Sequence, residues 1–378
     1  MFKFALIAAM SLFLMLEPAH AASKSTGRAT PTKRVKAKPA KSKQIVLARR
    51  GDLAKVIAQD NRERMVRRIA MVRGKRKVVY QKVRRAAPAI AILSAGDLAG
   101  LHRTADPLDL RSSVAYVLDQ SSSEVLFEKN ANVALPIASI TKLMTGLIVV
   151  QAHQNLDEVL TITDADVDKL KYSSSRLPVG TRMTRGNLLH IALMSSENRA
   201  AAALGRNYPG GISAFVAAMN AKARELGMSD TRYVDSSGLS SQNVSSARDL
   251  AKLAMVAHQE ALLRQYSTDP SYVVQASGRA MNFHTTNYLV GMPDWNIGLQ
   301  KTGFINEAGR CLVMQAVIQG RNVIMVFLDS KGKQSRIADA GRMRKWLEAM
   351  KPATLPANAA VSVPVTVSAA TTAPAMVQ

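Results

Sequence analysis

The chain has 378 residues, which is ample for a large hydrophobic core. It contains a single cysteine, which excludes an intramolecular disulfide, so the fold must be held together by packing. The formal net charge is +24. Between Lys24 and Arg85 there are 22 Lys and Arg residues and three acidic residues, so this segment alone carries +19. Most of the net charge therefore lies in an extension and not in the folded part.

The first residues have the features of a secretory signal. Lys3 provides a basic start, an apolar run follows from Phe4 to Leu16, and Ala19-His20-Ala21 is a small-residue cleavage site. The apolar run is shorter than the about 18 residues that a membrane-spanning helix needs, and Glu17 and Pro18 close it. We therefore expect an exported protein whose signal peptide, residues 1–21, is cleaved near Ala21.

Residues 22–88 are expected to form a basic, largely disordered or surface-binding extension. From Ser23 to Lys43 the composition cannot bury enough apolar surface to order itself. Residues 44–85 place apolar residues between arginines, so helical segments can form there on an anionic surface, and a solvated linker is the alternative. An exported protein rarely meets nucleic acid. Anionic wall polymer or a membrane surface is therefore the partner expected for residues 24–85.

The folded unit is expected over residues 89–350. Its first elements are a hairpin that pairs residues 114–118 with residues 124–128, and an apolar helix from Ser139 to Gln151 that follows Pro136. Residues 351–378 are Ala, Val, Pro and Thr without a period, which predicts a disordered tail.

The middle and the end of the unit differ in periodicity. Residues 185–265 are mostly helical by pattern, and a closing helix is expected at 335–350. Strand patterns return at residues 295–302, 311–318 and 322–328. Strands, then helices, then strands indicate an α+β fold, in which the terminal strands pair in one antiparallel sheet flanked by helices with a mostly helical insertion.

Ser139-Ile140-Thr141-Lys142 stands at the start of the first long helix. The i, i+3 spacing puts the serine hydroxyl and the lysine amine on one helical face, and the helix N-terminus favours a developing negative oxygen. Lysine can act as a base only if its pKa falls, which burial and a second nearby lysine would cause. Alone the pattern is weak, because Ser330-Lys331-Gly332-Lys333 also matches and an ordinary amphipathic helix would explain it.

Ser196-Glu197-Asn198 stands at a break between two helical runs. A serine there can relay a proton between the lysine and a leaving amine, and the asparagine amide can bind a substrate carbonyl. Ser241-Gln242-Asn243 fits the same three-residue pattern, so a capping or turn serine is the alternative.

Lys301-Thr302-Gly303 ends a strand. Lysine and threonine there can hold a substrate carboxylate, and glycine leaves room for a substrate backbone along the strand edge. Alone, the triplet could equally be a plain strand-end turn.

The order of the three motifs, with Ser196 standing 57 residues after Ser139, is that of penicillin-binding proteins and class A β-lactamases. From Ala115 to Glu348 the sequence resembles the D-alanyl-D-alanine endopeptidases among the small periplasmic penicillin-binding proteins. Glu197 stands where related carboxypeptidases commonly have glycine, which favours the endopeptidase branch. The likeness is carried by the segments 136–145, 193–201, 208–211, 246–250 and 301–304.

The resemblance implies a serine β-lactamase/transpeptidase-like fold and a periplasmic hydrolase of D-alanyl cross-links in peptidoglycan. It implies an acyl-enzyme that β-lactam antibiotics would trap, and neither a metal nor a cofactor. The basic extension lies outside the resemblance. The implied site consists of Ser139 as nucleophile, Lys142 as base, Ser196 and Asn198 completing the site, Lys301, Thr302 and Gly303 facing the substrate carboxylate, and the backbone N–H groups of Ser139 and Phe304 as oxyanion hole.

Other functions remain open at this point. A DD-carboxypeptidase shares every catalytic group, and a non-catalytic binder of anionic polymer would use the extension alone. A β-lactamase would need an acidic deacylation residue, for which no clear motif is present. No Gly-x-Ser-x-Gly or His-Glu-x-x-His pattern supports a His-based serine hydrolase or a zinc peptidase, and Cys311 has the surroundings of a core residue.

Overall fold

The computed structural model describes residues 64–72, 75–83 and 92–350, and contacts within the chain divide it into two units, residues 1–89 and 90–378. In the first unit, β1 (Arg64–Val72) and β2 (Lys75–Val83) form an antiparallel hairpin in which Val72 pairs with Lys75. The helical expectation is therefore wrong for these two segments. Both carry β-branched residues, and pairing with each other satisfies their backbone hydrogen bonds. The expected signal peptide, flexible arm and C-terminal tail lie outside the described residues.

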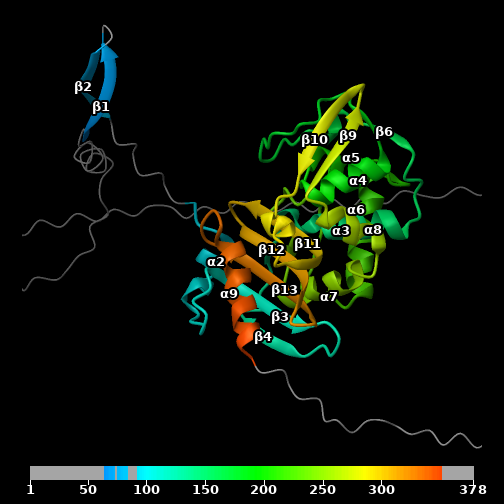
Figure 1. Ribbon diagram of the computed structural model, residues 1–378. Coiled ribbons are helices and arrows are strands. Elements are labelled where there is room, and N and C mark those ends of the chain that lie inside the picture. Colours follow the sequence, from blue (N-terminus) through cyan, green and yellow to red (C-terminus); the bar gives the residue numbers. More distant parts are fainter. Residues whose placement is uncertain (1–63, 73–74, 84–91, 351–378) are drawn as a thin grey trace, which may run out of the picture. The chain divides into compact units, whose positions relative to one another are not determined.

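The second unit is built on a five-stranded antiparallel sheet with the order β11-β12-β13-β3-β4. The first long strand of the unit pairs with the last, since Tyr116 lies opposite Val326. The prediction that terminal strands share one antiparallel sheet is confirmed (Figure 1). The strands are β3 (Ser112–Asp119), β4 (Val125–Lys129), β11 (Asn296–Ile305), β12 (Gly309–Ile318) and β13 (Arg321–Ser330).

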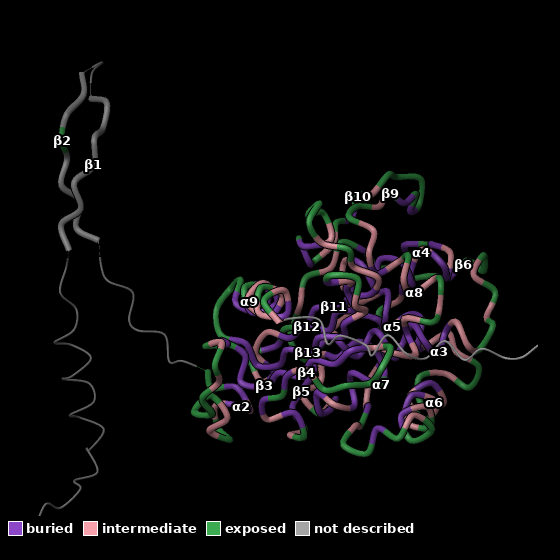
Figure 2. Tube along the Cα trace, turned by 60° about the horizontal axis from the view of Figure 1, so that its bottom comes forward, coloured by how far each residue is buried: buried purple, intermediate pink, exposed green. Residues whose placement is uncertain are grey.

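Both faces of the sheet are covered, which is why every residue of β3 is buried. Alternate side chains of a strand point to opposite faces, so Val114 and Tyr116 join the core shared with the helices of the insertion, whereas Val117 joins the core under α9 (Ser335–Ala349). Figure 2 shows these strands as a buried layer between more exposed helices. The sheet is thus a rigid support for anything attached to its strands.

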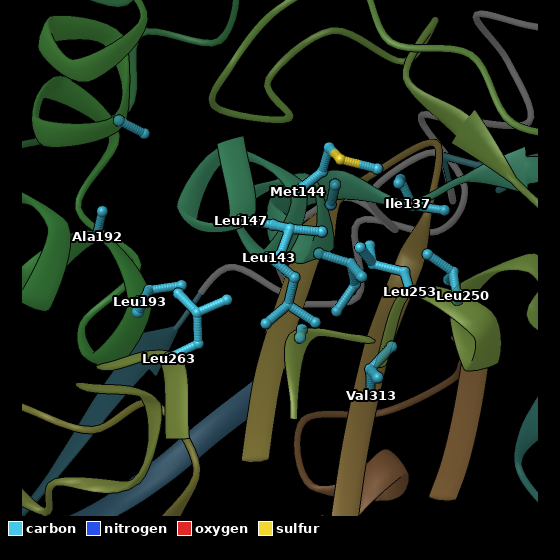
Figure 3. Close-up of a cluster of buried hydrophobic side chains, with 14 of the residues drawn as sticks. Ile137, Leu143, Met144, Leu147, Ala192, Leu193, Leu250, Leu253, Leu263 and Val313 are labelled. Carbon is cyan, nitrogen blue, oxygen red and sulfur yellow. The ribbon is translucent and has the colours of Figure 1, made fainter. Parts of the chain in front are cut away.

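The insertion is helical, as its periodicity predicts. Its central helix, α3 (Thr141–Gln151), is buried from Thr141 to Val149, as expected for a helix that is apolar on all sides. Figure 3 shows Leu143 and Leu147 of α3 among side chains of neighbouring elements. No described helix is both long and apolar enough to cross a bilayer. The other helices are α4 (Arg185–Met194), α5 (Asn198–Arg206), α6 (Gly211–Glu225), α7 (Ala247–Ala257) and α8 (Ala261–Thr268).

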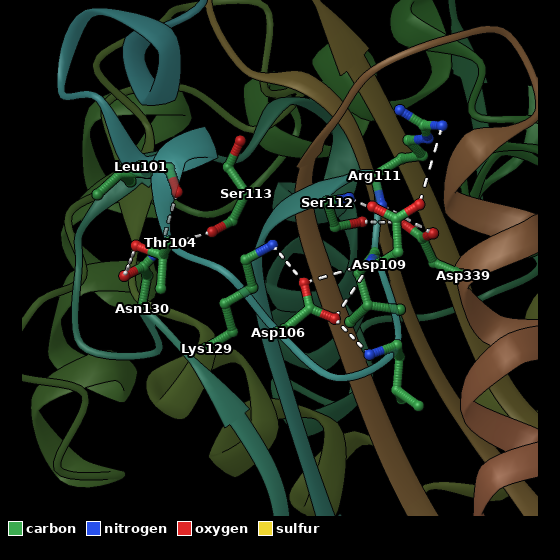
Figure 4. A network of polar contacts seen from close by, with 12 residues as sticks. Leu101, Thr104, Asp106, Asp109, Arg111, Ser112, Ser113, Lys129, Asn130 and Asp339 are labelled. Carbon is green, nitrogen blue, oxygen red and sulfur yellow. Dashed lines mark hydrogen bonds and ion pairs between the residues drawn. The ribbon is translucent and has the colours of Figure 1, made fainter.

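Several short elements and polar ties were not predicted. Asp339 of α9 accepts the backbone N–H groups of Arg111 and Ser112 at 3.0 and 2.8 Å and so fixes the start of β3, while buried Lys129 pairs with Asp106 at 2.8 Å (Figure 4). The additional elements are α2 (Ala95–Leu98), β5 (Leu135–Pro136), β8 (Val244–Ser245), β6 (Val159–Thr161), β7 (Arg182–Thr184), β9 (Ser271–Ala276) and β10 (Arg279–His284).

Candidate active site

Ser139 lies in a 3-10 turn (Ala138–Ile140) that leads directly into α3. It is half-buried, although Ala138 and Ile140 on either side are fully buried. Ala138 has a φ of 47°, in the left-handed region that is costly for a residue with a Cβ. Gly238 packs so closely that an added Cβ would lie 2.0 Å from Ala138 O. The surrounding chain therefore holds this turn in a strained conformation with the serine accessible.

Lys142 is fully buried one turn further along, and its Nζ donates to Ser139 Oγ at 2.8 Å. The other two donors of the ammonium go to Asn198 Oδ1 at 2.8 Å and to Ser237 O at 2.6 Å. Burial lowers the pKa of Lys142 to about 7, and the carboxylates of Asp235 and Glu197 act in the opposite direction. An amine with that pKa is substantially neutral near pH 7, as a general base must be.

Asn198 begins α5 and links Lys142 to a loop. Its amide Nδ2 donates to Ser173 Oγ at 2.9 Å while its Oδ1 accepts from Lys142. Ser196 has a φ of 61° and lines a pocket beside Asn198. Among the described residues, no hydrogen bond joins the Ser196 side chain to Ser139 or Lys142. The structure therefore brings Ser139, Lys142 and Asn198 into one hydrogen-bonded group and leaves Ser196 next to it.

Strand β11 brings Lys301, Thr302 and Gly303 to the same place, and the triplet lies inside this strand, which continues to Ile305, and not at its end as predicted. Gly303 packs against the turn, because an added Cβ would lie 3.2 Å from Ser139 N. Lys301 is fully buried and donates to Thr302 O at 2.9 Å; burial, then the charge of Lys142 and that of Arg336, lowers the pKa of Lys301 well below its usual range. β11 is the first strand in the sheet order, so one of its edges faces the site unpaired within this sheet.

Phe304, the next residue of β11, is half exposed and its ring lies beneath the Arg310 guanidinium at 4.5 Å. Its side chain is thus directed away from the buried lysines. The backbone of Gly303, immediately before it, meets the turn that carries Ser139. The peptide groups expected to form an oxyanion hole therefore belong to segments in direct contact.

A family model for D-alanyl-D-alanine carboxypeptidases matches residues 101–332, most of the described second unit. The chain belongs to this family. A Pseudomonas aeruginosa protein named D-alanyl-D-alanine endopeptidase is 48% identical over 253 residues, which cover 66% of this chain and 82% of the relative. The Escherichia coli protein of the same name is 43% identical over 258 residues, covering 68% and 83%. The Streptomyces K15 DD-transpeptidase structure matches 65% of this chain and 100% of its own, with 28% identity and a TM-score of 0.61.

These similarities confirm the resemblance to the endopeptidase branch and the α+β, transpeptidase-like fold. In this member of the D-alanyl-D-alanine carboxypeptidase family, a loop that was not predicted completes the site. Asp235 accepts the backbone N–H groups of Ser237 and Gly238, both at 2.6 Å, and so aims Ser237 O at Lys142. The sequence Asp235-Ser236-Ser237-Gly238 has the composition of a turn, but nothing local indicates that it meets a lysine.

The two further matches to the motif patterns, Ser241-Gln242-Asn243 and Ser330-Lys331-Gly332-Lys333, have structural roles in this family member. Asn243 is fully buried, and its side chain accepts the N–H of Val234 at 2.7 Å and donates to Thr141 Oγ1 at 3.1 Å. It therefore holds the 235–238 loop against α3. Ser330 and Lys331 lie at the end of β13, where Lys331 forms an ion pair with Asp97. Cys311 is buried, which raises the pKa of its thiol to about 12 and leaves it unreactive.

Proposed function

We propose that the protein is a serine DD-endopeptidase that hydrolyses D-alanyl cross-links in peptidoglycan through an acyl-enzyme. The observation that carries this proposal is the contact between Ser139 Oγ and a buried lysine whose pKa is lowered to about 7. A lysine at its usual pKa would be almost entirely protonated near pH 7 and could not accept the serine proton.

In the first step Ser139 Oγ attacks the D-alanyl carbonyl carbon and its proton passes to neutral Lys142. Backbone N–H groups of Ser139 and Phe304 would stabilise the resulting oxyanion. The C–N bond then breaks, the amine leaves with a proton delivered from Lys142, for which the Ser196 hydroxyl is the proposed relay, and an ester on Ser139 remains. Water attacks this ester, Lys142 takes the water proton, and the acid leaves as Ser139 recovers its hydrogen.

The two buried lysines act together in this mechanism. The charge of Lys142 lowers the pKa of Lys301. Because repulsion between two like charges is reciprocal, a proton on Lys301 would disfavour a proton on Lys142. A substrate carboxylate at Lys301 and Thr302 would draw a proton onto Lys301 and thereby hold Lys142 in the basic form. Substrate binding would then activate the base at the moment when it is needed.

The endopeptidase is distinguished from a carboxypeptidase by its products. Purified cross-linked muropeptides incubated with the mature protein should be converted from dimers to monomers, as followed by mass spectrometry. Loss of terminal D-alanine with intact dimers would identify a carboxypeptidase instead. A Ser139→Ala control should lack both activities and should not be labelled by penicillin while melting as wild type does. Undiminished labelling of that variant would contradict the assignment of the nucleophile.

The same proposal includes export to the periplasm, with β-lactams as acylating inhibitors and anionic wall polymer as the partner of residues 24–85. The charge of +19 in that segment supports the last part. Deleting residues 24–85 should abolish salt-sensitive binding to isolated sacculi while hydrolysis of small muropeptides continues. Binding that survives the deletion would contradict the role given to the extension.

A further inference from the structure

A pocket of about 290 Å³ is lined in part by Ser196 and Asn198, and its charged residue Arg176 has no part in the reaction steps above. Its walls are residues 174–176, from the loop before α4, and residues 195–198, between α4 and α5. All seven side chains are polar or charged: four serines, one asparagine, Arg176 and Glu197. Such a lining favours a strongly polar ligand group and disfavours an apolar side chain.

Arg176 and Glu197 bring opposite charges to this pocket without neutralising each other. Arg176 Nη1 donates to Asn282 O at 2.7 Å, and Glu197 Oε1 accepts from Ser175 Oγ at 2.5 Å. Within residues 92–350, the salt bridges present include neither of the two. The Glu197 carboxylate also favours the charged form of Lys142 at longer range, but neither Glu197 nor Arg176 is held in one of these salt bridges, so each can pair with a ligand group of the opposite sign.

Both charges are held in place before any ligand binds. The Arg176 guanidinium lies 4.6 Å from the centre of the Phe283 ring on β10, in addition to its hydrogen bond to that strand. Glu197 is only 8% exposed, stands directly before α5 and is held by the hydrogen bond from Ser175. A ligand would not have to order these side chains, so little binding free energy is lost to entropy.

We propose that this pocket is a subsite for a zwitterionic amino-acid group of the substrate, with its ammonium at Glu197 and its carboxylate at Arg176. A lone ammonium would leave the guanidinium as a repelling neighbour, and a lone carboxylate would face the Glu197 carboxylate. A diamino-dicarboxylic acid in a peptide stem presents such a group when its second amino and carboxyl groups are free. The inference rests on the proposed function, because the peptide bound at Ser139 would carry this group into the pocket.

The test uses three synthetic peptides with the same scissile D-alanyl bond. The diamino acid of the first carries a free ammonium and a free carboxylate, the second has the carboxylate converted to an amide, and the third has the amine acetylated. Wild type should hydrolyse the first with a kcat/KM about 10-fold or more above the other two, as charged hydrogen bonds predict. Arg176→Gln should abolish the preference for carboxylate over amide, and Glu197→Gln the preference for ammonium over acetylated amine.

Each preference is the ratio of two kcat/KM values measured on the same variant with two peptides. A change in the pKa of Lys142 caused by Glu197→Gln affects both values equally and therefore cancels. Arg279→Gln, an exposed position on β10 outside the pocket, is the matched control and should keep both preferences. Equal hydrolysis of the three peptides by wild type would overturn the subsite and leave the proposed function intact. Preferences that persist in Arg176→Gln and Glu197→Gln, or vanish in the control, would overturn it too. Absence of hydrolysis of every peptide by wild type would instead refute the proposed function.

Discussion

Gly303 offers a direct test of how β11 positions the nucleophile. A Cβ added there would lie 2.8 Å from Ile137 O and 3.2 Å from both Ala138 Cβ and Ser139 N. Ordinary contact begins at 3.4 Å, so strand and turn must separate by about 0.6 Å. The nearest neighbour is a backbone carbonyl and not the flexible tip of a side chain. The movement in Gly303→Ala therefore displaces the turn that carries Ser139.

A misplacement of about 1 Å can cost about 100-fold in rate, so a shift of about 0.6 Å predicts a loss of roughly 10-fold or more in the rate of penicillin acylation. Overpacking should also lower the free energy of unfolding by about 1–3 kcal/mol. Time-resolved labelling with a fluorescent penicillin measures the first quantity, and urea unfolding measures the second.

Gly341→Ala on α9 is the matched control, because an added Cβ there meets nothing within 4 Å. It should leave acylation unchanged and stabilise the helix by up to about 1 kcal/mol. Wild-type acylation by folded Gly303→Ala would refute the argument that close packing of β11 on the turn sets the position of Ser139.

Three further predictions concern the charged groups. The acylation rate should rise with pH through about 7, because the neutral fraction of Lys142 grows as pH passes its pKa, and a rate that is flat or falls from about pH 6 to 8 would contradict its role as base. Lys301→Met should lower kcat/KM for carboxylate-bearing peptides by about 100-fold, because the substrate carboxylate loses its charged partner. The variant should be no less stable to urea than wild type, because a buried lysine destabilises the folded state. An unaltered kcat/KM would show that Lys301 does not bind the carboxylate. Lys171 and Glu307 pair at 2.5 Å with both side chains about one-third exposed, and Lys171 lies two residues before Ser173, which is bonded to Asn198. Lys171→Met should therefore raise the KM for a peptide substrate by only about fivefold or less. The charge-swapped pair Lys171→Glu with Glu307→Lys should restore the KM, and no recovery would mean that the ion pair does not position the loop that carries Ser173.

The regular elements were largely predictable because their signals are local. The hairpin of β3 and β4, the helix after Pro136 and the helical middle follow from alternation, helical period and turn residues. The secondary structure of residues 64–72 and 75–83 in the extension could not be predicted from such local signals. Apolar residues between arginines in β1 and β2 suit a helix on a surface as well as a paired strand, and only the partner strand decides between them. β9 and β10 were missed for a related reason, since more than half of their residues are exposed and their apolar residues show no clear alternation with polar ones.

The sequence by itself determined which chemical groups the protein has and how some of them are spaced. Ser139 and Lys142 share a helical face because they stand three residues apart, and that relation holds wherever the helix lies. Glu197 and the Lys301-Thr302-Gly303 triplet were identifiable in the same way, by residue type and order.

Only the tertiary structure decided what these groups can do. The pKa of Lys142 depends on burial among side chains distant in sequence, and its third hydrogen bond comes from Ser237 O, 95 residues away. Burial and the nearby charge of Lys142 lower the pKa of Lys301, and two separate loops bring Arg176 and Glu197 into the lining of one pocket. Desolvation and charge–charge interaction depend on distance in space, so no local pattern carries them, and the packing of β11 against the turn of Ser139 creates the site.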